Sequence, residues 1–137
     1  HHELPHLYRA VLEGIAYEQL LVLSMIEADT DVRAERVRLM GGGANSALWV
    51  RMIADVFERP VEVTDHTETT ALGAAVLAAA AVGIDATSDV VATAQRMSQG
   101  WRTIEPGTRH RDVYRRRYDV YRELYPALAG VFARLAD

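Results

Sequence analysis

The first part of the chain carries apolar residues at the three- and four-residue spacing of an amphipathic helix. This pattern predicts a helix over residues 5–29, and Pro5 suits its first turn because the N–H that proline lacks would be unpaired there. Gly14 inside this helix costs about 1 kcal/mol relative to alanine, so we expect close packing or ligand approach to compensate. The apolar positions that set the spacing are Leu4, Tyr8, Val11, Ile15, Val22 and Ile26.

In the next part of the chain the pattern changes from strand to helix and back to strand. Residues 36–40 and residues 61–64 are short apolar-alternating runs of the kind found in strands. Residues 46–58 between them have an apolar stripe at helical spacing, and Pro60 ends that helix. A helix of this length between two strands predicts a right-handed parallel crossover. The stripe consists of Leu48, Trp49, Met52, Ile53, Val56 and Phe57.

An alanine-rich run without charges follows the second strand. It predicts a helix that ends just before Gly83, because glycine is the residue type that most often follows a helix end. Asp65 or Thr67 is expected to cap the start of this helix, and Glu68 stands where it would complete a capping box with Asp65. The run, residues 69–84, is shorter than a membrane span, so we expect it to pack closely against a neighbouring helix.

The last part of the chain predicts two further helices. Thr87 and Ser88 open the first, and residues 100–107 are then extended or irregular. Residues 109–135 form a long final helix that is basic and aromatic, a composition also found in nucleic-acid contacts. A buried stripe on one helix face, with the arginines in solvent, is the favoured interpretation. The expected stripe is Tyr114, Tyr118, Tyr121 and Tyr125.

The composition is that of one globular domain, residues 1–137, with half of the residues hydrophobic and a quarter charged. Its net charge of −4 provides no general attraction for nucleic acid or for an acidic membrane surface, and we expect neither partner. The chain contains no cysteine, which excludes disulfides, thiolate metal sites and cysteine nucleophiles. We expect a cytoplasmic protein, since a reducing compartment is compatible with this composition.

Histidines near the N-terminus raise the question of a metal site, because imidazole is a common metal ligand. A frayed chain end explains them better, since chain ends are usually poorly ordered unless something ties them down. We therefore expect no metal site there. The residues concerned are His1, His2 and His6.

Three consecutive glycines, residues 41–43, separate the first strand from the helix that follows it. A turn without side chains lets a ligand approach the backbone closely. The start of the next helix offers unpaired N–H groups and a positive dipole end to an anion. Ser46 is placed to cap that helix, which would orient the same N–H groups. The pattern indicates a nucleotide or phosphate site.

Two further interpretations of these residues remain open at this level. Gly41, Gly43 and Ser46 match a dinucleotide-binding fingerprint that lacks its third glycine, and Asp65 ends the second strand, near where that fold places a ribose-binding acid. Such a domain would require a further strand–helix repeat. A P-loop is excluded, because no Gly-Lys-Ser/Thr follows at the required spacing. The second alternative is a non-catalytic interaction module that pairs an exposed sheet edge with another chain.

Several segments together resemble the C-terminal signature of the FGGY carbohydrate kinases, a family that includes xylulokinase, gluconokinase, ribulokinase and glycerol kinase. The resemblance is collinear over nearly the whole chain, and the turn with Trp49 is most similar to the xylulokinase-like pentulose kinases. The segments are residues 9–16, 41–49, 54–56, 59–61 and 68–75, together with the tyrosines of the last helix.

The resemblance implies an α/β fold that is the later part of an actin-like, ribonuclease H-like ATPase domain. Its mixed sheet would have flanking helices, and the family's second domain begins with strands that would precede His1. Gly42 and Gly43 would approach the α-phosphate and ribose of ATP or ADP, Ser46 would flank the adenine, and Asn45 would assist. The implied nucleotide-binding residues are Gly41, Gly42, Gly43, Ala44, Asn45 and Ser46.

The resemblance also implies which parts of the reaction lie elsewhere. The family's catalytic aspartate, its sugar-binding residues and the loop that meets the β- and γ-phosphates belong to its first domain. We therefore expect the full-length protein to transfer the γ-phosphoryl group of ATP to a sugar hydroxyl, with Mg²⁺ held mainly by the nucleotide and the first domain. This chain alone is expected to be inactive. A homodimer is a further expectation, since an incomplete domain exposes apolar surface.

Two carboxylates, Glu13 and Glu68, invite interpretation as a general acid/base pair. No feature of the sequence brings them together. We expect Glu68 to cap its helix and Glu13 to make a buried or interdomain hydrogen bond.

Overall fold

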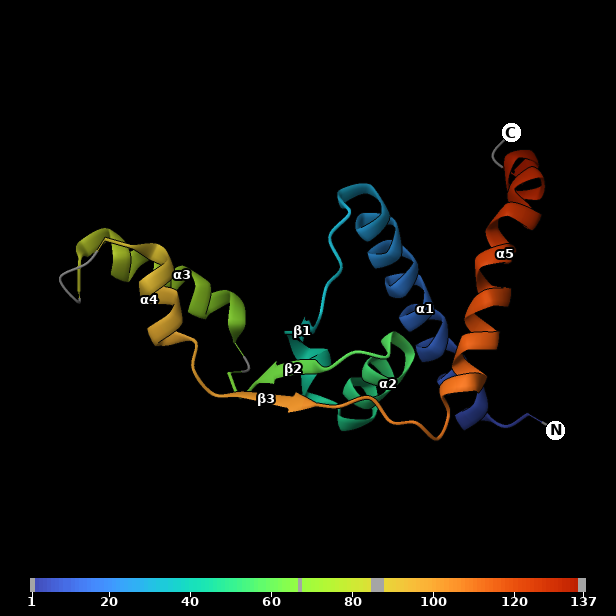
Figure 1. The fold of residues 1–137 in the computed structure, drawn as a ribbon, viewed down its shortest axis with the longest axis horizontal. Coiled ribbons are helices and arrows are strands. Elements are labelled where there is room, and N and C mark those ends of the chain that lie inside the picture. The colour runs from blue at the N-terminus through green and yellow to red at the C-terminus, as the bar shows by residue number, and fades with distance from the viewer. Residues whose placement is uncertain (1, 67, 85–87, 136–137) are drawn as a thin grey trace.

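The computed structural model describes residues 2–66, 68–84 and 88–135 (Figure 1). His1, Thr67 and Thr87, for which the sequence suggested roles, lie outside the described residues. The helix-rich α/β class expected from the sequence is confirmed. In chain order the elements are α1 (Leu4–Thr30), β1 (Val37–Leu39), the 3-10 helix η1 (Gly42–Asn45), α2 (Ala47–Phe57), β2 (Val61–Thr64), α3 (Thr69–Val82), α4 (Val90–Met97), β3 (Trp101–Ile104) and α5 (Arg111–Leu135).

The strands form one mixed sheet in the order β1-β2-β3. β1 and β2 are parallel, with Val37 opposite Val61 and Leu39 opposite Val63, so the predicted parallel crossover through α2 is confirmed. β3 runs antiparallel to β2 and lies within the segment expected to be extended or irregular. β1 therefore occupies one edge of the described sheet.

Helix α2 covers one face of this sheet, and α1 and α5 pack against the other side of α2 (Figure 1). The predicted stripe of α2 is buried from Met52 onward, and Ile53 is only 1% exposed. Leu48, at the start of the stripe, is 52% exposed because it precedes the part of the helix that is enclosed on both sides. The main core is Ala16, Tyr17, Val50, Met52, Ile53, Ala54, Val56, Phe57, Val61, Val63 and Tyr114.

Helix α1 has apolar residues on two faces. The residues that set the sequence spacing, from Leu4 to Ile26, are exposed. The face that packs on the core lies beside them and includes Leu12, Ala16, Tyr17, Leu20 and Leu23. Of the two compensations expected for Gly14, close packing is wrong, because a Cβ built at this position meets no atom within 4 Å, and ligand approach stays a prediction.

Helices α3 and α4 pack on each other and project from the sheet, at the left of Figure 1. The predicted capping box is wrong, since α3 begins at Thr69 with Glu68 in the cap position and no side-chain hydrogen bond there. Asp65 is held elsewhere, because its N–H donates to the carbonyl of Gly100 and so extends the pairing of β2 with β3. Gly83 ends α3 with φ of 66°, as predicted.

Helix α4 is capped by Asp89, whose carboxylate accepts the N–H of Val91, and not by Ser88. None of the described helices has the length and apolar character needed to cross a bilayer.

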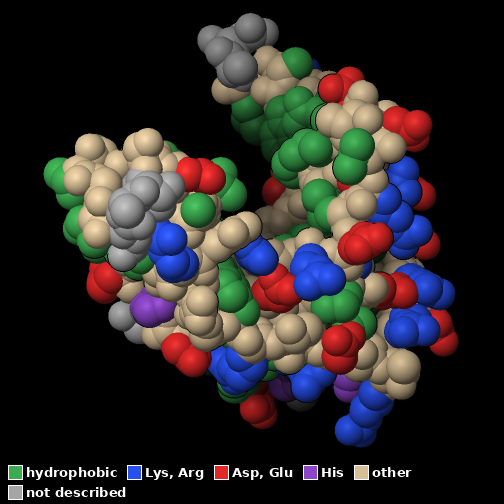
Figure 2. All heavy atoms as spheres, turned by 60° about the vertical axis from the view of Figure 1, so that its left-hand side comes forward, with side chains coloured by type: hydrophobic (Ala, Val, Ile, Leu, Met, Phe, Trp, Pro, Cys, Tyr) green, Lys and Arg blue, Asp and Glu red, His purple; other side chains and the backbone are tan. Residues whose placement is uncertain are grey.

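The tyrosine stripe of α5 is only partly buried. Tyr114, Tyr118 and Tyr121 face Tyr17 of α1, with ring centroids 5.6 to 6.4 Å from that of Tyr17. Tyr125 was expected in the same buried stripe, but it is 69% exposed because α5 extends past its contact with α1. Figure 2 shows hydrophobic side chains gathered on this last part of α5.

The sheet face away from α2 carries an ion cluster around Glu62, whose side chain is only 8% exposed. Arg36 donates to one carboxylate oxygen of Glu62 at 2.7 Å, and Arg38 donates to the other at 2.8 Å. The guanidinium of Arg38 also lies over the ring of Trp101, 4.6 Å from its centroid. The hydrogen bonds from Arg38 and Arg36 hold the pKa of Glu62 below its ordinary value.

Truncating Ile53 to alanine is expected to lower the free energy of unfolding by about 2–5 kcal/mol, because it opens a cavity between the sheet and α1. Leu48→Ala removes an exposed side chain from the same helix and should cost less than about 1 kcal/mol. Chemical denaturation followed by circular dichroism measures both. Equal losses for the two variants would contradict the assignment of the core.

The ion cluster predicts a pH dependence of stability. Because folding lowers the pKa of Glu62, its contribution is complete above the ordinary glutamate pKa of 4.5 and is lost as the pH falls through the lowered value. Glu62→Gln should therefore destabilise the chain more at pH 7 than at pH 3 in urea denaturation. Glu123→Gln, on the exposed side of α5, is the control and should have little effect at either pH. A Glu62→Gln effect that does not change with pH would contradict this assignment.

Candidate functional site

The glycine turn forms a tight link between β1 and α2. Gly41 takes φ of 81°, a left-handed conformation that favours glycine. The chain then makes the single turn η1, in which the N–H of Ala44 donates to the carbonyl of Gly41 at 3.0 Å and that of Ser46 to Gly43 at 3.1 Å. Ser46 caps α2, because its hydroxyl oxygen accepts the N–H of Trp49 at 3.3 Å. The predicted cap is confirmed.

The other two glycines differ in what surrounds them. A Cβ built on Gly43 would lie 3.1 Å from ring atoms of Trp49, so the indole packs directly on the backbone of the turn. A Cβ built on Gly42 meets nothing within 4 Å. A side chain at position 43 would therefore crowd Trp49, whereas the space beside Gly42 is open.

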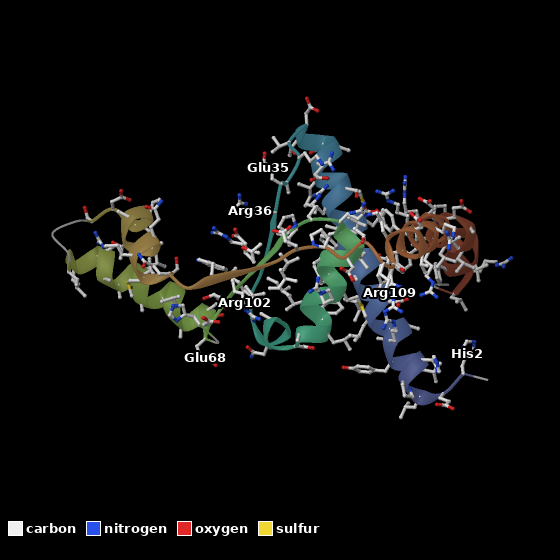
Figure 3. All side chains as sticks on the ribbon, turned by 60° about the horizontal axis from the view of Figure 1, so that its bottom comes forward. His2, Glu35, Arg36, Glu68, Arg102 and Arg109 are labelled. Carbon is white, nitrogen blue, oxygen red and sulfur yellow. The ribbon has the colours of Figure 1, made fainter. Side chains whose placement is uncertain are left out.

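A cavity of about 410 Å³ lies beside the turn, between the start of α2 and strands β2 and β3. Arg102, labelled in Figure 3, reaches it from β3 on the side where η1 lies. Arg51 is tied to the cavity wall by its bond to the carbonyl of Glu105 at 2.7 Å. The lining residues are Ala44, Asn45, Ala47, Val50, Arg51, Thr64, Asp65, Arg102 and Ile104.

Of the six residues implied by the resemblance, Ala44 and Asn45 line this cavity and the others form the turn and the helix cap. Asp65, which the sequence connected with helix capping and with the dinucleotide-binding alternative, lies in the same cavity. Arg51 and Arg102 were not identified from sequence. Strand periodicity over residues 101–104 was the signal that could have placed Arg102 near β2.

Glu13 and Glu68 do not form a pair. Glu68, labelled in Figure 3, precedes α3. Glu13 lies on α1 and is buried. Its carboxylate accepts hydrogen bonds from Arg9 at 2.8 Å and from Arg117 of α5 at 2.6 Å, so the expected buried hydrogen bond is confirmed. Burial beside this group raises the pKa of Tyr17 to about 12. The cluster joins α1 to α5.

Among the described residues, no three histidine, aspartate or glutamate side chains gather closely enough to hold a metal ion. Residue His1, part of the N-terminal histidine group, lies outside the described part.

The chain order after β2 weighs against the dinucleotide-binding alternative. Two helices follow β2, and the next strand, β3, is antiparallel. A dinucleotide-binding domain would continue with a further parallel strand.

Comparison with known proteins identifies the family of this chain. Residues 1–82 match the model of the FGGY family of carbohydrate kinases, C-terminal domain. The chain is 32% identical over 137 residues to an L-xylulose/3-keto-L-gulonate kinase of Escherichia coli, covering 99% of this chain and 27% of that protein. It is 45% identical over 78 residues to glycerol kinase 2 of Thermotoga maritima, covering 57% of this chain and 16% of that protein.

Solved structures agree with this result. A xylulose kinase from Rhodospirillum rubrum superposes with a TM-score of 0.68 at 31% identity, over 96% of this chain and 26% of that one. The chain thus spans about a quarter or less of these similar proteins. It belongs to the FGGY family of carbohydrate kinases and corresponds to the C-terminal domain of that family.

Proposed function

We propose that this chain is the nucleotide-binding part of a sugar kinase that transfers the γ-phosphoryl group of ATP to a sugar hydroxyl. The turn at residues 41–46 would hold the adenosine side of ATP. The observation that carries this proposal is the open space beside Gly42, at the end of β1 and next to a cavity large enough for part of a nucleotide. Membership of a carbohydrate kinase family supports the reaction class.

Each part of the turn has a physical role in this proposal. Gly42 lets the α-phosphate and ribose approach the backbone, because no side chain stands there. Ser46 satisfies an N–H of the first turn of α2 and so holds the helix start in place. The positive end of the α2 dipole favours a nearby phosphate. Ala44 and Asn45 are available for contacts with the nucleoside, since both line the cavity.

The γ-phosphate chemistry is assigned to the rest of the protein. Phosphoryl transfer needs a base for the attacking hydroxyl and cations around the γ-phosphate. Mg²⁺ is normally held by one or two carboxylates together with phosphate oxygens and water. Among the described residues, Asp65 is the one carboxylate that lines the cavity, and it does not make a magnesium site by itself. The ion is therefore expected to arrive with the nucleotide and to be held by groups outside this chain.

A pentulose such as xylulose is the acceptor we propose. Similar proteins include the kinase named for L-xylulose and the xylulose kinase of known structure. Relatives named for glycerol and gluconate also align with this chain. This range of names fits a division of labour in which the first domain selects the sugar and the present chain serves the nucleotide common to all.

Calorimetric titration of MgADP into a solution of the chain is expected to give saturable binding at one site. Gly42→Ala should weaken that binding at least tenfold, because the added methyl group occupies the space proposed for the nucleotide. The variant should keep the unfolding midpoint of the parent, since the new Cβ meets no protein atom within 4 Å.

Gly130→Ala is the matched control, because its Cβ also meets nothing within 4 Å and it lies on α5, far along the chain from the turn. It should bind MgADP like the parent chain. Absence of saturable binding at millimolar MgADP, or equal binding by the Gly42 variant, would refute the proposed nucleotide site.

The chain by itself is expected to show no kinase activity, because the groups that act on the γ-phosphate and the sugar are assigned to another domain. A coupled assay of ADP release with MgATP and D-xylulose should give the same rate with and without the chain. The same assay without the sugar measures background hydrolysis. Sugar-dependent ADP release by the purified chain would overturn this division of labour.

A further inference from the structure

The cavity beside the turn is lined by one carboxylate and one guanidinium group that form no ion pair with each other or with any other described residue. Asp65 and Arg102 both line it, and the ion pairs of the described part of the chain involve other side chains. Arg51, the other cation of the lining, is bonded to the carbonyl of Glu105. Asp65 is exposed, and no other described residue donates a hydrogen bond to its carboxylate.

The strand register fixes where this acid stands relative to the turn. Leu39, the last residue of β1, is opposite Val63 in the parallel pair, so the glycine turn leaves the sheet at the same edge at which β2 ends and Asp65 follows. Neighbouring strands lie about 4.8 Å apart. Alternation along β2 also gives Asp65 the same face as Val61 and Val63, the face covered by α2. Asp65 therefore lies at the same edge of the sheet as the glycine turn, and it lines the cavity together with Asn45 of that turn.

The chemistry of a carboxylate decides which part of a nucleotide it can take. An ionised carboxylate only accepts hydrogen bonds and repels phosphate, so its partner must donate. The ribose 2′- and 3′-hydroxyls are donors, and the ribose that carries them is joined to the α-phosphate through its 5′ oxygen. With the phosphate at the turn, the sugar is the part that comes within reach of a residue one strand away. Arg102, a pure donor, is free to face the phosphate side.

We infer that Asp65 is the residue that selects a ribonucleotide, by accepting hydrogen bonds from the hydroxyls of its ribose. This inference rests on the proposed nucleotide site. It adds a residue to that site that lies outside the glycine turn, on the neighbouring strand. Its consequence is a preference for ADP over 2′-deoxy-ADP that depends on the side chain at position 65.

Titration of the chain with MgADP, 2′-deoxy-MgADP and MgIDP tests this inference. The parent chain should bind ADP about tenfold more tightly than 2′-deoxy-ADP, as expected for the loss of a hydrogen bond to a charged group. Asp65→Ala should reduce this ratio to about one by weakening ADP alone. The ratio of ADP to IDP should stay as in the parent, since the base is not the proposed partner.

Glu68→Ala removes the same charge from an exposed position outside the cavity lining and should leave both ratios unchanged. Equal affinity of the parent chain for ADP and 2′-deoxy-ADP overturns the inference. This measurement needs no variant, so it tests the inference even if Asp65→Ala does not fold. A change confined to the ADP-to-IDP ratio also overturns it, by assigning Asp65 to the base. Failure of every nucleotide to bind refutes the proposed site itself, which is a distinct result.

Discussion

Burial of helix α2 on both of its sides is the constraint on which the rest of this structure depends. One side packs on Val61 and Val63 of the central strand, and the other packs on Tyr17 of α1 and Tyr114 of α5. Each contact removes apolar area from water at about 25 cal/mol per Å². Because α2 begins directly after the glycine turn, the same packing that stabilises the fold also determines where the turn lies.

Two charged pairs at the C-terminal end of α2 extend this arrangement to the neighbouring helices. The carboxylate of Glu27 in α1 accepts hydrogen bonds from both terminal nitrogens of Arg59, at 2.6 and 2.9 Å. It also accepts a hydrogen bond from the N–H of Ala34. Glu58, at the end of α2, receives two hydrogen bonds from Arg115 of α5. These groups orient α1 and α5 around α2, and the proposed nucleotide site lies at its other end.

Sequence patterns predicted local structure correctly where that structure depends only on neighbouring residues of the chain. Ser46 caps α2 and Gly83 ends α3 as expected, because a cap needs only its own helix end. Asp65 was misassigned as a cap since the same residue also served to extend β2 beside β3. Tyr125 was misassigned as buried because periodicity identifies a helix face and cannot say how far a neighbouring helix extends along it.

The sequence by itself determined the order of the elements, the glycine turn with its capped helix, and the family resemblance that the comparisons bear out. Periodicity and turn chemistry are properties of neighbours along the chain, so they can be read there. Only the tertiary structure decided which apolar face of α1 is buried and that Asp65, Asn45 and Arg102 line one cavity. Their proximity follows from strand pairing and register, which bring together residues that are distant along the chain. No local sequence pattern between those residues indicates the pairing.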